Sequence, residues 1–260
     1  MDGFPAIKRR AMIEEYRAAT DGLHIGQTVY VDTDVDETDL GREIAAIFSL
    51  ADDPVNRIGG IVAGAKLEKP EPFAHLAKWL LHPKLKGIRR VLHTQPDELS
   101  REPRFRENMR EVERRAWSFD LCVLPRQLPL ARDLVGSFPG VTFILDHCGG
   151  PDIKGRALDP WRRDLQDLSA QSNVVCKVSG LITCADPRNW SVEDLRPFFE
   201  HVVACFGWDR LLWGGDWPVC NLNASLKDWL DAAKTLTARA TEEQRAKFFE
   251  GNARRIYRLA

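Results

Sequence analysis

Hydrophobic and polar positions along this chain follow two alternating periods. Short runs rich in apolar, β-branched and aromatic residues are typical of buried strands. Between them, apolar residues recur every three or four positions, as Leu40, Ile44, Ile47 and Phe48 do, which predicts amphipathic helices. We expect strands at 27–31, 58–63, 87–93, 119–123, 141–148, 174–179 and 211–213. We expect helices at 5–21, 38–51, 71–82, 103–116, 161–171 and 192–206, with others beginning near Leu128, Ser225 and Thr241.

The regular alternation of strand and helix predicts the fold class. It implies parallel strands joined by right-handed crossovers, with the helices outside. A closed barrel and an open doubly wound sheet both satisfy this pattern, but neither Gly-rich phosphate loop of nucleotide-binding sheets occurs in the sequence. We therefore expect an α/β protein with a TIM-type (β/α)8 barrel, in which one strand is unaccounted for. Residues 1–260 are expected to form a single domain.

Composition narrows the classes of partner. The net charge is -1, and the 37 basic and 38 acidic residues are mixed along the chain, which disfavours a nucleic-acid footprint. No apolar run approaches membrane-spanning length and no signal core follows Met1. The sequence thus favours a soluble cytoplasmic protein with a small-molecule partner, and leaves a homo-oligomer open. Six cysteines without a C-x-x-C pair favour buried reduced thiols.

Asp216 stands at the carboxyl end of the last expected strand, between Trp213 and Trp217. Pro218 cannot donate to a ladder, so the strand must end there. A carboxylate enclosed by indole rings is costly unless it meets a partner, and barrel enzymes place catalytic residues at the carboxyl ends of strands. Asp216 is therefore a candidate catalytic residue and Trp217 a candidate substrate contact. A turn cap is the alternative role for Asp216.

His147 and Lys177 are the next candidates. His147 ends the expected strand 141–148, where an imidazole can bind a metal, polarise a carbonyl or move a proton. The alternative is a buried histidine bonded to a neighbouring strand. Lys177 lies inside an apolar run, and a buried lysine needs a partner. We expect it to neutralise Asp146 or Asp216, or to bind a substrate anion.

Strand alternation in residues 87–93 separates two arginines. Arg89 and His93 lie on one face and Arg90 on the other, so one arginine enters the barrel and the other faces the helices. Arg89 together with His93 at the rim would suit a carboxylate or lactone substrate. A salt bridge to a surrounding helix is the alternative. We interpret the remaining histidines as surface or packing residues; they are His24, His75, His82 and His201.

Six segments together resemble a known family. They are residues 87–100, 119–129, 143–153, 174–181, 206–222 and 248–259. The ordered set resembles the metal-dependent amidohydrolase superfamily (amidohydrolase-related family 2), in its sugar-lactonase branch. The resemblance implies a TIM-barrel hydrolase of carbohydrate metabolism that opens a small lactone. It places the family's strand-eight aspartate on Asp216 and its strand-six histidine on His147. Its pocket arginine and lysine fall on Arg89 and Lys177.

The chain also departs from this family. Members open with a first strand that ends in His-x-His, and no His-x-His occurs here. A histidine at the end of strand 119–123 is absent too. The resemblance implies a divalent metal, with zinc expected, but His147 and Asp216 supply fewer than the three protein ligands zinc usually takes. The first strand is therefore expected to be missing or altered. A truncated enzyme and an impaired relative that keeps a small-molecule pocket both stay open.

The expected mechanism is hydrolytic. Asp216 takes a proton from the attacking water, and His147 hydrogen-bonds the ring carbonyl or holds a metal that does so. Arg89, His93 and Lys177 orient the hydroxyls or carboxylate of the substrate. A site without metal also has a precedent in the pyrone-dicarboxylate lactonase branch of the family.

Overall fold

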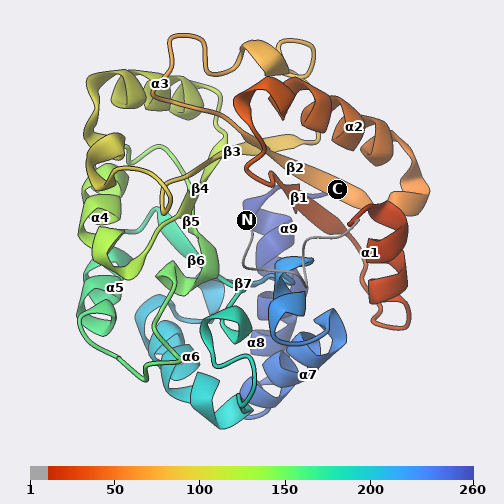
Figure 1. The fold of residues 1–260 in the computed structure, drawn as a ribbon, viewed down its shortest axis with the longest axis vertical. Coiled ribbons are helices and arrows are strands. Elements are labelled where there is room, and N and C mark those ends of the chain that lie inside the picture. The colour runs from red at the N-terminus through yellow and green to blue at the C-terminus, as the bar shows by residue number, and fades with distance from the viewer. Residues whose placement is uncertain (1–10) are drawn as a thin grey trace.

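A computed structural model describes residues 11–260, and its strands form one parallel sheet of seven members in chain order. They are β1 (Thr28–Val31), β2 (Ile58–Gly64), β3 (Leu85–Val91), β4 (Ser118–Cys122), β5 (Phe143–Leu145), β6 (Val174–Val178) and β7 (Leu211–Trp213). The sheet curls, and the helices lie around its outside (Figure 1). The predicted α/β class with parallel strands is therefore confirmed. Within residues 11–260, β1 and β7 are the two edges and do not pair with each other.

Helices alternate with the strands much as the apolar periodicity predicts. They are α1 (Ile13–Thr20), α2 (Leu40–Asp52), α3 (Pro103–Arg114), α4 (Leu128–Ser137), α5 (Trp161–Ser169), α6 (Val192–Phe206), α7 (Leu226–Leu236), α8 (Glu242–Ala246) and α9 (Asn252–Ile256). Helix α8 begins after a capping box, in which Thr241 accepts from Gln244 and the Gln244 side chain accepts in return. Of the expected helix 5–21, residues 5–10 lie outside the described residues.

The expected helix at 71–82 is wrong. This segment consists of turns around one short 3-10 helix, Ala74–Leu76. Tertiary contacts outweigh its helical pattern: the Trp79 ring stacks on Phe48 with centroids 5.1 Å apart. His75 Nε2 lies 2.9 Å from the carbonyl oxygen of Gly64. Proline at position 72 also removes a backbone donor that a helix would use.

The expected strand at 141–148 is shorter than its apolar run. Only Phe143–Leu145 pair as β5, and the chain then turns through Asp146–Gly149. His147 and Cys148 there adopt left-handed backbone angles, with φ of 52° and 53°. A strand cannot continue through such angles, so the imidazole leaves the sheet at its carboxyl edge.

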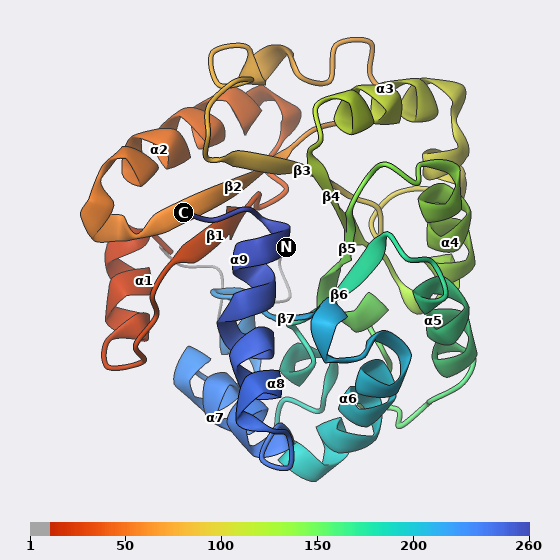
Figure 2. The same ribbon diagram turned by 180° about the vertical axis from the view of Figure 1, so that it is seen from behind.

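The core has an outer and an inner part. Outward-facing strand residues such as Ile61, Ile88 and Phe119 pack against the helices. A smaller inner cluster joins Val62, Ile144, Val175 and Leu212 to Tyr257, which follows α9. The C-terminal segment therefore covers the amino ends of the strands, and Figure 2 shows α9 lying across this side. The C-terminal segment leaves the opposite side, where the strands end, uncovered, and this is where barrel enzymes place their active sites.

The structure also bears on the cysteines and on the presence of membrane-spanning helices. All six cysteines are free thiols; four of them are buried, as the sequence predicts, whereas Cys184 and Cys205 are partly exposed. Within residues 11–260, no helix combines the length and the apolar character that a membrane crossing requires.

Candidate active site at the carboxyl ends of the strands

The imidazole of His147 and the carboxylate of Asp216 meet at this edge of the sheet. His147 follows β5, Asp216 follows β7, and Nδ1 of the histidine lies 3.8 Å from Oδ1 of the aspartate. Ser179, which follows β6 between them, places Oγ 2.9 Å from the same Nδ1. The curled sheet thus brings together the two side chains that the sequence singled out from positions 69 residues apart (216 − 147).

The backbone at this pair is strained. His147, Cys148 and Asp216 have positive φ angles of 52°, 53° and 53°, which are uncommon for residues with a side chain. Between them, Gly180 has a φ of +64°, and a Cβ there would lie 2.8 Å from His147 Nδ1 and 3.1 Å from Asp216 Oδ2. Only glycine lets the chain pass so close. Strained positions of this kind cluster at functional sites.

The Asp216 carboxylate is largely enclosed, yet within residues 11–260 no structural hydrogen bond holds it. Its side chain is 12% exposed, and burial raises the pKa of its carboxyl group above 3.8, with His147 acting in the opposite direction. No hydrogen bond from residues 11–260 reaches the carboxylate oxygens, and Trp229 fixes the turn before it by donating from Nε1 to the Gly214 carbonyl. The carboxylate is therefore available to a water molecule.

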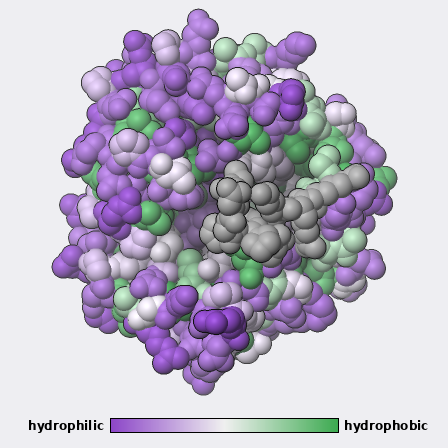
Figure 3. Space-filling model, in the orientation of Figure 1, coloured by the Kyte–Doolittle hydropathy of each residue, from purple (hydrophilic) through white to green (hydrophobic). Residues whose placement is uncertain are grey.

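Trp217 directly follows Asp216 in the chain and is partly exposed. Its ring packs against that of Tyr16 in α1, with centroids 5.3 Å apart. The face on which the strands end is mainly hydrophilic where it is visible, with hydrophobic side chains in scattered patches (Figure 3).

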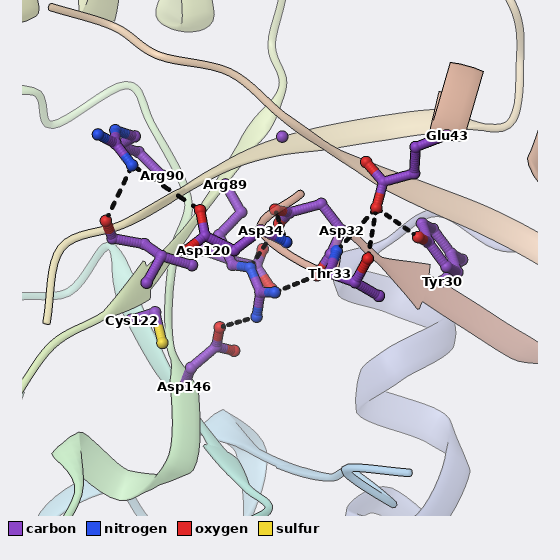
Figure 4. Close-up of polar contacts among 12 residues, drawn as sticks. Tyr30, Asp32, Thr33, Asp34, Glu43, Arg89, Arg90, Asp120, Cys122 and Asp146 are labelled. Carbon is purple, nitrogen blue, oxygen red and sulfur yellow. Dashed lines mark hydrogen bonds and ion pairs between the residues drawn. The ribbon is translucent and has the colours of Figure 1, made fainter. Parts of the chain in front are cut away.

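A chain of buried ion pairs lies inside the curled sheet. Arg89 Nε is 2.5 Å from Asp32 Oδ1, and Arg89 Nη1 is 3.2 Å from Asp146 Oδ2 (Figure 4). Lys177 Nζ then joins Asp146 Oδ1 at 2.7 Å to Asp120 Oδ2 at 2.6 Å. Of the roles expected for Lys177, neutralisation of Asp146 is therefore present, and Asp120 is a second partner. Tyr257 also donates to Asp120, at 3.2 Å.

The ion pairs set the protonation of this interior. Burial acts to raise the pKa of Asp146, but the cations of Lys177 and Arg89 outweigh it and lower that pKa below its ordinary value. Asp120 contacts only one of these cations, and burial leaves its pKa raised. Burial acts to lower the pKa of Lys177, yet Asp120 and Asp146 hold it well above its ordinary value. Lys177 is therefore a fixed cation.

The two arginines of β3 point to opposite faces of the strand, as the two-residue alternation predicts. Arg89 is the one that faces inward, whereas Arg90 pairs with Glu68 outside the site, Nη2 to Oε1 at 2.7 Å. His93 is exposed at the rim, with Nδ1 3.2 Å from Cys122 Sγ. The Arg89 guanidinium is held inside the sheet by Asp32 and Asp146, so it does not lie with His93 at the rim, and contact of these two side chains with a substrate stays a prediction.

Three side chains place donor atoms close enough together to hold a metal ion. Atoms of Cys122, Asp146 and His147 lie within 4.8 Å of one another, and residues 11–260 contain no other such group of His, Cys, Asp and Glu. Both carboxylate oxygens of Asp146 are already held by cations. Burial, with Asp146 nearby, raises the pKa of the Cys122 thiol, although zinc requires a thiolate. These donors do not fit a resident zinc ion as they are bonded.

Several residues of this site were not singled out from the sequence. Asp32 and Ser179 directly follow strands, which is the same signal that identified Asp216. Asp120 and Cys122 alternate with the apolar residues of β4, so the two-residue period places them on the inward face. The alternation that separates Arg89 from Arg90 in β3 also identifies these inward-facing residues in β4.

Comparison with known proteins adds to this geometry. A family model described as Amidohydrolase matches residues 1–259. The L-fucono-1,5-lactonase of Burkholderia multivorans is 32% identical over 233 residues, covering 84% of this chain and 77% of the relative. That of Burkholderia ambifaria is 30% identical over 207 residues, covering 78% and 71%. A crystal structure of a Burkholderia multivorans amidohydrolase with bound zinc has a TM-score of 0.89 at 27% identity, covering 97% of this chain and 90% of that one.

Proposed function

Because this chain belongs to the amidohydrolase family, as its motifs predict, we propose that it hydrolyses a small lactone, a sugar-acid lactone or a related ring. The observation that carries the proposal is the largely enclosed Asp216 carboxylate, free of structural hydrogen bonds from residues 11–260 and 3.8 Å from His147. Lactonase relatives at 30% and 32% identity support the reaction type. A hydrolase that opens an ester ring needs this combination of a base and a donor to the carbonyl.

We also propose that residues 1–260 form one barrel domain of the TIM type. The TM-score of 0.89 to an amidohydrolase supports this architecture. The position of the family's first strand, between β7 and β1, is not filled by residues 11–260. The sequence predicts that the family's first strand is missing or altered, and this stays a prediction.

The proposed reaction uses the chain's own side chains. The Asp216 carboxylate takes one proton from water as the water oxygen bonds to the lactone carbonyl carbon. His147 donates a hydrogen bond to the carbonyl oxygen, on which negative charge develops. The bond from that carbon to the ring oxygen then breaks, and Asp216 returns its proton to the ring oxygen. The product is the open hydroxy acid, and Asp216 is again ionised.

The remaining predicted site residues divide into two groups. His93 is exposed at the rim, and Trp217 is partly exposed beside Asp216, so we propose both for direct contact with the substrate. Arg89 and Lys177 make their bonds to carboxylates of the interior. We propose that these two cations orient the substrate indirectly, by fixing the interior carboxylates that lie beneath the substrate site.

A lactone screen of the purified full chain tests the function. Sugar-acid 1,5- and 1,4-lactones and 2-pyrone-4,6-dicarboxylate are offered, and ring opening is followed by acid release at constant pH. We expect at least one lactone to reach a kcat/KM of about 10⁴ M⁻¹ s⁻¹ or more, the lower end of the usual enzymatic range. If none opens faster than with heat-denatured protein, the alternative of an impaired relative with a small-molecule pocket replaces this proposal.

Removal of divalent metal is expected to leave lactone opening unchanged. The physical reason is that both carboxylate oxygens of Asp146 are bonded to cations, so a zinc ion would have to displace existing bonds. The measurement is the rate before and after dialysis against a strong chelator, with metal content determined on the same samples. Loss of activity that zinc restores would contradict this expectation.

A further inference from the structure

Among the residues that the structure describes, the Ser179 side chain has one hydrogen-bond partner. It is 1% exposed, and its hydroxyl oxygen lies 2.9 Å from Nδ1 of His147. Its backbone N–H donates to the Lys177 carbonyl at 3.0 Å. Within residues 11–260, no other atom is hydrogen-bonded to the hydroxyl. The proposed reaction gives Ser179 no role.

Because the Ser179 hydroxyl has no other partner within residues 11–260, it decides which ring nitrogen of His147 carries the proton. If Nδ1 carried the proton, it would donate to Ser179 Oγ, and the serine hydrogen would lack an acceptor among the described residues. If the serine donates to Nδ1 instead, the hydroxyl is satisfied and the imidazole proton lies on Nε2. Buried donors are rarely left unpaired. A penalty of that kind is large enough to favour the second arrangement about tenfold or more.

Asp216 does not reverse this preference by hydrogen bonding. Its Oδ1 is 3.8 Å from Nδ1, beyond hydrogen-bond distance, whereas the serine oxygen is within it. Gly180 packs closely on the same edge of the ring, where even a Cβ would lie 2.8 Å from Nδ1. The Nδ1 edge is therefore enclosed. The histidine side chain is still 28% exposed, and no hydrogen bond from residues 11–260 reaches Nε2.

We infer that Ser179 is a positioning residue that holds the His147 ring in the Nε2–H tautomer, so that the ring serves as a hydrogen-bond donor to the substrate carbonyl. The inference rests on the proposed function for the identity of that carbonyl. It separates the two central roles: Asp216 is the base, and His147 is the electrophilic partner.

Nitrogen NMR of the chain with ¹⁵N-labelled histidine tests the inference, since ring nitrogens with and without a proton differ in chemical shift. The His147 signals are assigned from their loss in His147→Gln. We expect wild type to carry the proton on Nε2, Ser179→Ala to lose this preference, and Ser179→Thr to retain it through its hydroxyl. The kcat of Ser179→Ala is expected to fall about tenfold with little change in KM, in line with the lost tautomer preference.

Ser169→Ala is the matched control. Ser169 is also a buried serine, but its hydroxyl donates to the Gln166 carbonyl at the end of α5, so its loss should change neither the NMR signals nor kcat. An Nδ1–H form in the wild type, or an unchanged form in Ser179→Ala, would overturn the inference. Should Ser179→Ala not fold, wild type and Ser179→Thr still decide the tautomer. If no lactone is opened, the proposed function fails while the NMR result still judges Ser179.

Discussion

Asp216→Asn is expected to lower kcat for lactone opening by about a hundredfold or more, the scale of a lost general base. An amide keeps the size of the side chain but cannot take a proton from water. Because the base works only when ionised and burial raises its pKa above 3.8, wild-type kcat/KM should fall as the pH drops through that raised pKa. The measurement is the pH profile of both proteins, and the variant should lack this acid limb.

Asp209→Asn provides the matched control in the same segment. Asp209 precedes β7, is exposed, and pairs with Lys247 at 2.9 Å, away from His147. Its substitution should leave both kcat and the acid limb as in wild type. Near-wild-type turnover by Asp216→Asn, or an acid limb that survives in it, would remove Asp216 from the role of base.

Lys177→Met is expected to lower the free energy of unfolding by about 3–5 kcal/mol, as when one partner of a buried ion pair is removed. Methionine keeps the apolar stem but leaves Asp120 without a cation and Asp146 with Arg89 alone. Urea unfolding followed by circular dichroism measures the change. Adding Asp120→Asn to this variant should recover part of the loss, because it removes the carboxylate with no remaining cation.

Lys227→Met is the control for this effect. Lys227 pairs with Asp231 on the exposed face of α7, at 2.5 Å, and surface pairs of this kind contribute little to stability. A Lys177→Met protein that unfolds at the same urea concentration as Lys227→Met would contradict the structural importance of the interior ion pairs.

Local patterns in the sequence were sufficient for most elements. The Ser191 cap and apolar period place α6 at the predicted 192–206, and the apolar run Leu211–Trp213 is β7 as predicted. Both signals depend on neighbours within a few residues, so no distant contact is needed to interpret them. The site could be approached in the same way, because His147 and Asp216 each stand where an apolar run ends.

Contacts between distant residues decided the rest. The sequence alone indicated a parallel α/β protein of the amidohydrolase family with an aspartate and a histidine at strand ends. Only the tertiary structure showed that Lys177 binds Asp120 and Asp146, that Arg89 is held inside, and that residues 71–82 form turns. The reason is physical: a side chain's partner is set by how the sheet curls, and that curvature arises from packing over the whole chain. The bond from Ser179 to His147 belongs to this second class, since it joins neighbouring strands 32 residues apart.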